Sequence, residues 1–233
     1  MKYLSFLAII ILATACHTKT GSGNIVTEKR NTESFMAVSA AGPVHVDIQT
    51  GEVESVTVEA DDNLMSYIET KVSGNTLQVR LRGINSLRNA TVNIHIIAPE
   101  LKGLNASSGS SILGKDTIVS PDHLELKASS GAELKLQADA PTVSAEASSG
   151  GSITATGRTK EITANASSGA TLNVSGLHAE TGTASASSGG SVKVYGSVNL
   201  DVTASSGGEV KYSGGAPAVK KNESSGGSIS AGN

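Results

Sequence analysis

A tetrapeptide that recurs at near-constant spacing constrains the fold of this chain more than any other feature of its sequence. Ala-Ser-Ser-Gly occurs six times, and a seventh copy reads Glu-Ser-Ser-Gly. Successive copies begin 22, 19, 19, 20, 18 and 19 residues apart. Such a period is typical of proteins in which one short structural unit stacks on the next. The copies begin at Ala106, Ala128, Ala147, Ala166, Ala186, Ala204 and Glu223.

Aliphatic residues keep a fixed place relative to each copy. One stands six residues after the start of every copy, and apolar residues alternate with polar ones along each repeat. A period of two indicates β-strands with one buried face, whereas the Gly, Ser, Thr and Val content disfavours helices. The fixed register also argues against Ser/Gly-rich disorder. The column consists of Ile112, Leu134, Ile153, Leu172, Val192, Val210 and Ile229.

Each repeat is predicted to make one circuit of a coil. A unit of about 19 residues is too short for the four strands of a propeller blade, so successive circuits should stack as parallel strands about 4.8 Å apart. Because parallel crossovers are overwhelmingly right-handed, the predicted fold class is all-β, a right-handed parallel β-helix over residues 101–233. The serines should form ladders along one corner, where glycine takes positive φ at low cost.

Residues 28–100 do not repeat, but their alternating segments predict a β-rich region. Ser73-Gly74-Asn75 is a hairpin signal. Asp61-Asp62-Asn63 is predicted to cap a short helical turn through Leu64, Met65 and Tyr67, and the adjacent carboxylates favour a turn over a calcium site. Two interpretations stay open for this region: a cap that covers the unpaired amides at the end of the β-helix, or the wider opening coils of the same solenoid.

The first sixteen residues are typical of an export signal. A positive start is followed by the apolar run Tyr3–Leu12, which is too short to span the ~30 Å hydrocarbon core of a membrane. Cys16, the single cysteine of the chain, follows the small residues Ala13-Thr14-Ala15. This pattern resembles the bacterial lipobox, which implies cleavage before Cys16 and lipidation of its thiol. A plain signal peptide cut near Cys16 is the alternative.

These patterns divide the N-terminal part of the chain into two segments. Residues 1–15 are predicted to be a lipoprotein signal peptide, and residues 16–27, which are polar and contain Gly and Ser, a flexible tether. Because His17 stands where Asp would suggest retention in the inner membrane, the resemblance implies an outer-membrane destination. The leaflet that the protein faces stays open.

Several segments in their order resemble a known family. Ser34-Phe35, Val44–Val46, Val58–Leu64 and Gly74–Leu77, followed by the Ser-Gly repeats, resemble the bacterial putative auto-transporter adhesin, head GIN domain family. The resemblance covers about Val26 to Asn233. It implies a secreted or outer-membrane-anchored β-helical protein, and the family offers no catalytic motif to transfer.

Composition and spacing disfavour several function classes. A net charge of −3 provides no basic face for nucleic acid. One cysteine rules out an intramolecular disulfide framework and a Cys-based zinc site. No histidine pairs with another His or Cys at ligand spacing, so no metal site and no cofactor are predicted. The histidines are His17, His45, His95, His123 and His178.

No catalytic residue is predicted, and the chain is expected not to be an enzyme. The serines recur in every coil, whereas a nucleophile is needed once, beside a base. A polysaccharide lyase needs a cleft walled by long loops, for which the coil spacing leaves little room. The exposed charges after the turns are expected to keep a strand face soluble; they include Glu133, Glu209, Lys193 and Lys211. Arg80, Arg82 and Arg88 either line a solvated loop or meet an anionic headgroup or polymer.

The sequence thus predicts a non-enzymatic, lipid-anchored cell-envelope protein that serves adhesion or surface interaction through a β-helical rod. A polysaccharide-binding or polysaccharide-processing β-helix protein is one alternative, and a periplasmic scaffold or sensor component is another. The expected partners are the membrane, through the lipid anchor, and a glycan or a host or cell-surface protein. A second copy of the chain is a further candidate partner, and nucleic acid is not expected.

Overall fold

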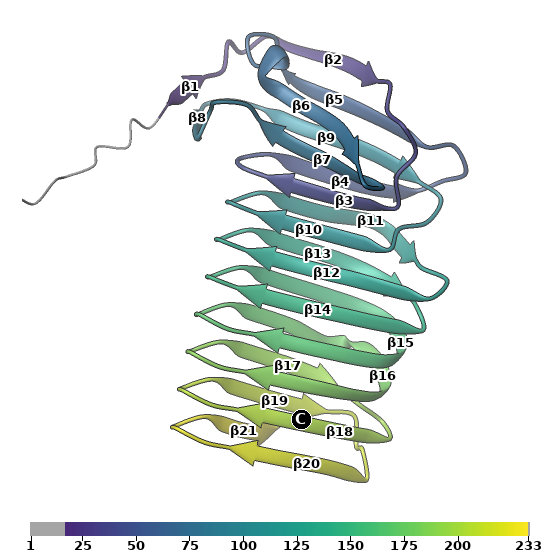
Figure 1. The fold of residues 1–233 in the computed structure, drawn as a ribbon, viewed down its shortest axis with the longest axis vertical. Coiled ribbons are helices and arrows are strands. Elements are labelled where there is room, and N and C mark those ends of the chain that lie inside the picture. The colour runs from purple at the N-terminus through teal and green to yellow at the C-terminus, as the bar shows by residue number, and fades with distance from the viewer. Residues whose placement is uncertain (1–16, 233) are drawn as a thin grey trace, which may run out of the picture.

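The computed structural model describes residues 17–232 and confirms an all-β parallel solenoid with about six coils spaced about 20 residues apart (Figure 1). Each coil places one strand on each of two faces, and the core lies between these faces. The first face contains β10 (Gly103–Ser107), β12 (His123–Ser129), β14 (Thr142–Ser148), β18 (Asn199–Ala204) and β20 (Ala218–Glu223). The second contains β11 (Ser111–Val119), β13 (Glu133–Asp139), β17 (Ser191–Tyr195), β19 (Glu209–Ser213) and β21 (Ser228–Ala231). Two long strands, β15 (Ser152–Ala166) and β16 (Thr171–Ala186), run through both faces.

The predicted aliphatic column is confirmed as a continuous stack. Leu134 pairs with Ile153, Ile153 with Leu172, and the pairing continues in register to Ile229. The members from Ile112 to Val210 are buried, and Ile229 is partly buried at the end of the stack. On the first face the alanines of the tetrapeptide stack in the same way and are also buried. Because alanine is small, the two faces enclose a thin core.

The Ser-Ser-Gly turns owe their shape to the backbone. In each turn the first serine accepts a hydrogen bond from the backbone N–H three residues on, as in Ala170 N–H to Ser167 O (3.1 Å). The two residues between them both have positive φ, 49–55° for the second serine and 71–77° for the glycine. These values are those of a type I′ turn. The expectation that glycine alone relieves the corner is therefore incomplete, because the second serine adopts the left-handed conformation as well.

Backbone groups also join neighbouring turns along this corner. The N–H of the turn glycine donates to the carbonyl of the left-handed serine in the next coil, as in Gly131 to Ser149 (3.2 Å) and Gly150 to Ser168 (3.1 Å). The serines were predicted to form a ladder along this corner, and the hydrogen bonds of that ladder join backbone N–H and carbonyl groups. The repeat of 22 residues is accommodated on β11, whose register with β13 shifts between Leu113 and Thr117.

The N-terminal region combines both interpretations that the sequence left open. β3 (Ala37–Ala41) and β4 (His45–Thr50) stack in parallel on β10 and β11 as an additional coil. β7 (Thr76–Leu81) and β9 (Val92–Ala98) stack in parallel on β3 and β4. The coil of β7 and β9, which comes later in the sequence, therefore lies farther out than the coil of β3 and β4. After β9 the chain returns past β3 and β4 to start β10 (Figure 1).

Antiparallel strands cover the outer end of this stack. β5 (Ser55–Asp61) pairs with β9, β2 (Ile25–Arg30) pairs with β5, and β6 (Ile68–Ser73) pairs with β7. The predicted hairpin is the β6–β7 turn, and the predicted helical turn is the 3₁₀ helix η1 (Met65–Tyr67). No side chain caps η1 by a hydrogen bond, so the carboxylates before it serve another purpose.

Those carboxylates hold the segment that the sequence suggested as part of a flexible tether. The buried Asp61 carboxylate accepts the backbone N–H groups of Gly23 (2.6 Å) and Thr91 (2.7 Å). Asp62 accepts the Ser22 hydroxyl, and the Asn63 amide donates to the carbonyl of Thr20. β1 (Thr18–Thr20) also pairs in parallel with β8 (Ser86–Arg88). Among the described residues 17–27 of the segment predicted as a tether, cap side chains thus satisfy backbone groups of Thr20 and Gly23.

The predicted signal peptide and Cys16 lie outside the described residues. Among residues 17–232, no helix has the length and apolar character needed to cross a membrane.

Candidate functional site

The solenoid has two long edges, one at each end of the stacked strands (Figure 1), and they differ in the residues that form them. Along one edge the Ser-Ser-Gly turns repeat from coil to coil. Along the other, which we call the crossover edge, the chain passes from the second face of one coil to the first face of the next. The turn edge repeats the same residues because every coil makes the same turn. The residues of the crossover edge differ from coil to coil, and this shared turn does not explain them. The crossover edge is therefore the candidate functional surface, and its segments are 120–122, 139–141, 157–160, 177–180 and 195–198.

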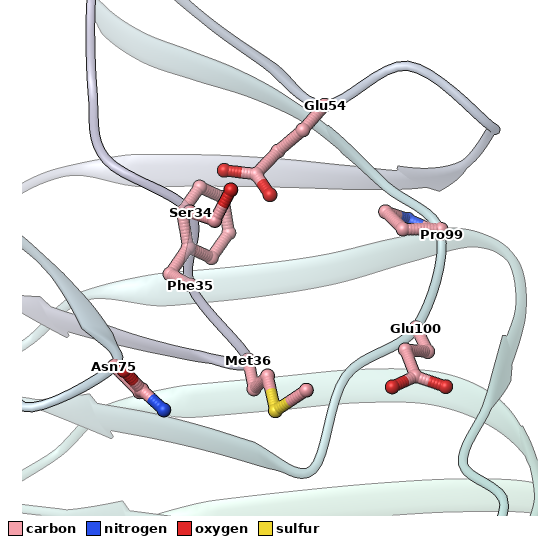
Figure 2. A pocket seen from close by; sticks show the side chains of 7 residues that line it. All are labelled: Ser34, Phe35, Met36, Glu54, Asn75, Pro99 and Glu100. Carbon is pink, nitrogen blue, oxygen red and sulfur yellow. The ribbon is translucent and has the colours of Figure 1, made fainter.

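An open pocket of about 400 Å³ lies at the cap end of the crossover edge (Figure 2). Phe35 and Met36, which precede β3, and Pro99, which follows β9, supply its apolar part. The carboxylates of Glu54 and Glu100 border the same space, with Glu54 beside the Phe35 ring in Figure 2. An apolar surface bordered by two carboxylates favours a cationic group.

Farther along the crossover edge, four side chains from four successive coils form a column. Asp139, Arg158 and His178 stand at equivalent positions of β13, β15 and β16, since strand pairing places each opposite the next. Tyr195, at the end of β17, completes the column, because its ring meets the His178 ring edge-on with centroids 4.6 Å apart and an interplanar angle of 73°.

The acid and the base of this column are paired. Arg158 donates from Nη2 and Nε to Asp139 Oδ2 at 2.6 and 3.0 Å. The hydrogen bond from Arg158 holds the pKa of the Asp139 carboxyl below its ordinary value, and the same contact raises the pKa of the guanidinium. The pair therefore stays ionised at neutral pH and presents both a donor and an acceptor group to the solvent.

Comparison with known proteins identifies the family. The family model described as "Putative auto-transporter adhesin, head GIN domain" matches residues 34–216. The chain belongs to this family. The resemblance found in the sequence is thereby confirmed. Among curated proteins, no significant match to this head GIN domain chain is found.

Solved structures share the fold of this head GIN domain chain at low sequence identity. A putative adhesin from Bacteroides fragilis is 16% identical, with a TM-score of 0.83 over 91% of this chain and 99% of that one. A putative adhesin from Parabacteroides merdae is 16% identical, with a TM-score of 0.75 over 93% and 100%. A putative lipid binding protein from Parabacteroides distasonis is 19% identical, with a TM-score of 0.69 over 93% and 100%. At these identities the likeness establishes the fold alone.

Three of the four charged residues singled out after the turns lie close together in the structure, and Glu133 lies apart from them. Glu133 and Glu209 stand in one column of the second face, with three coils between them. Glu209 instead pairs with Lys211 on its own strand at 2.9 Å. Lys193 lies directly opposite Lys211. The head GIN domain chain thus places Lys193, Glu209 and Lys211 side by side on the second face, and Glu133 lies farther along it.

Two of the three arginines singled out in the sequence meet a single carboxylate. Arg80 Nε and Arg82 Nη2 each lie 2.6 Å from a Glu69 oxygen, across the β6–β7 pair. The hydrogen bonds from Arg80 and Arg82 keep the pKa of Glu69 below its ordinary value. Arg88 lies apart from them on β8. Glu69 therefore offsets one of the two guanidinium charges, and one positive charge is left at this place.

Histidines that are far apart in the sequence meet on the second face. His45 Nε2 lies 3.3 Å and His95 Nδ1 3.6 Å from oxygens of Asp47, and Lys115 Nζ lies 3.2 Å from the same carboxylate. Sequence spacing could not reveal this cluster, because β9 and β11 flank β4 only through the out-of-order stacking. Within the described residues, no group of three or more His, Cys, Asp or Glu side chains is arranged to hold a metal ion.

Proposed function

We propose that this chain is a non-enzymatic, lipid-anchored protein of the cell envelope that mediates adhesion or surface interaction through its rod. The observation that carries the proposal is that one edge of the solenoid repeats its residues and the other does not. The chain also belongs to an adhesin-like family. Folding accounts for the repeated turn edge, whereas the side chains of the crossover edge change from coil to coil. Such a rigid, extended surface suits the binding of a macromolecular partner.

The anchor in this proposal is Cys16. β1 begins two residues later, at Thr18, and two residues reach at most about 7 Å. A lipid on Cys16 would therefore hold the cap close to the membrane and direct the rod away from it. In cells fed radiolabelled palmitate, the natural protein should incorporate label and sediment with membranes, whereas Cys16→Ser should do neither. Equal labelling of the two proteins would contradict the anchor.

Binding is tested with the purified mature chain that carries Cys16→Ser, applied to an array of glycans and matrix proteins. We expect saturable binding to at least one immobilised partner and reduced adherence of cells that lack the protein. Protease treatment of intact cells should degrade the protein if it faces outward. Protection from protease, unchanged adherence and an array without binding would overturn the proposal in favour of a periplasmic scaffold.

A further inference from the structure

The column formed by Asp139, Arg158, His178 and Tyr195 is not explained by the folding of the solenoid. Its members differ from coil to coil, whereas the turn edge and the core repeat. The Arg158 side chain is 78% exposed, so its ion pair with Asp139 contributes little to stability. Exposed, non-repeating polar groups on a rigid frame are typical of a binding surface.

Hollows on both sides make the column accessible. One, of about 440 Å³, continues past the column to Pro141, Lys160 and Glu180. The other, of about 620 Å³, continues to Thr117, Gln137 and Thr156. Asp139, Arg158 and His178 line both hollows, so the column forms a ridge between two open grooves.

Glycines beside Thr156 allow neighbouring coils to lie close together. A Cβ on Gly157, whose φ is 113°, would lie 2.1 Å from the carbonyl oxygen of Ala138. A Cβ on Gly176 would lie 2.9 Å from the methyl group of Thr156. The coils can therefore approach each other here, and the column keeps the strand spacing of about 4.8 Å.

The column is also held in place before any ligand arrives. Parallel pairing fixes the backbone of Arg158 and His178, Asp139 orients the guanidinium, and the Tyr195 ring packs against the imidazole. A prearranged site loses less conformational entropy on binding. The surrounding charges also balance, since Asp139 opposes Arg158 and Glu180 is accompanied by Lys160.

We infer that this column is a binding site for a neutral oligosaccharide that runs across the coils. The Asp139–Arg158 pair supplies an acceptor and donors for vicinal hydroxyl groups, and the rings of His178 and Tyr195 supply surfaces for the apolar faces of sugar rings. Balanced charge disfavours a highly charged polymer of either sign. The inference rests on the proposed surface-binding function, and it names the ligand class and the site.

The test is calorimetric titration of the mature chain carrying Cys16→Ser with cellohexaose, hexa-N-acetylchitohexaose and maltohexaose, and with a heparin hexasaccharide as the anionic comparison. We expect at least one neutral hexasaccharide to bind, with a dissociation constant raised tenfold or more in Arg158→Ala and in His178→Ala. Lys220→Ala is the matched control, because Lys220 pairs with Asp201 away from the crossover edge. The affinity of this variant for the hexasaccharide should be unchanged.

Binding of heparin alone, binding of no neutral hexasaccharide, or equal affinity in all variants would overturn the inference. If a variant fails to fold, the site is mapped instead by amide chemical shifts of the chain with an unchanged column, recorded with and without the hexasaccharide. Shifts should then concentrate at residues 139, 158, 178 and 195, and shifts elsewhere would refute the site. Array binding that persists in Arg158→Ala would remove this site but leave the proposed function intact.

Discussion

At the scale of single residues, a buried carboxylate decides how the N-terminal segment is held. Asp61 is 1% exposed, and its two oxygens accept backbone N–H groups from Gly23 and Thr91. A charge can be buried at tolerable cost when hydrogen bonds replace those of water. Its neighbour Asp62 is exposed and binds side chains of Ser22 and Asn24. The adjacent residues Asp61 and Asp62 therefore differ in how they hold the N-terminal segment.

Asp61→Ala should lower the free energy of unfolding by on the order of 3 kcal/mol, because two backbone N–H groups lose their charged acceptor. Asp62→Ala, the matched control, should cost clearly less. Urea unfolding followed by circular dichroism measures both, and limited proteolysis should show cleavage between residues 17 and 30 only in the Asp61 variant. Equal losses in the two variants would contradict the role given to Asp61.

The left-handed serines offer a second test at this scale. Ser168 has a φ of 54°, which a β-branched residue adopts only with strain. Ser168→Val should cost about 1–2 kcal/mol, whereas Ser168→Gly should be neutral or slightly stabilising. Thermal unfolding of the two variants provides the comparison. A valine variant as stable as the natural protein would show that the turn does not need this conformation.

At the scale of secondary-structure elements, register determines which side chains are buried. Along β16, Leu172 lies in the core and its neighbour Thr171 is exposed, because successive side chains of a strand point to opposite faces. Thr171 and Leu172 pair in register with Ser152 and Ile153 on one side and with Ser191 and Val192 on the other, so the same alternation holds in the neighbouring coils.

Leu172→Asp should destabilise the stack by several kcal/mol, because it places an unpaired charge in the core. Thr171→Asp introduces the same charge one residue away, on the solvent side, and should be tolerated. Ser168→Ala should also cost far less than Leu172→Asp. Circular dichroism and thermal melting of the purified variants decide between these outcomes, and equal tolerance of aspartate at positions 171 and 172 would refute the buried seam.

At the scale of the whole molecule, ion pairs and hydrogen bonds to carboxylates occur both in the cap and along the rod. Glu69 in the cap and Asp139 on the crossover edge both have lowered pKa values, caused chiefly by hydrogen bonds from arginines. A carboxyl whose pKa is lower in the folded than in the unfolded state stabilises the fold above its unfolded pKa. That contribution is lost as the pH falls through the folded pKa.

Stability should therefore be nearly independent of these groups from pH 7 down to about 5 and decline below about pH 4. Melting temperatures between pH 7 and pH 2.5 measure the decline. Glu69→Gln cannot lose a charge on acidification, so its decline should be shallower than that of the natural protein. An identical acid profile in the variant would show that Glu69 makes no contribution.

The coil, its period, the buried aliphatic column and the position of the turns could all be predicted from the amino-acid sequence. Each depends on contacts between equivalent residues of neighbouring repeats, so a local pattern carries the information. The hairpin at Ser73–Asn75 and the turn after Asn63 were also predictable, because Gly, Asn and Asp favour these conformations locally.

Only the tertiary structure decided how the non-repeating parts combine. The outward placement of β7 and β9 brings His95 beside Asp47, and the cap brings Asp61 beside Gly23. The column from Asp139 to Tyr195 arises because the stacking aligns crossover residues that share no sequence motif. The physical reason is that hydrogen bonds and ion pairs between distant segments depend on three-dimensional register, which leaves no period in the sequence.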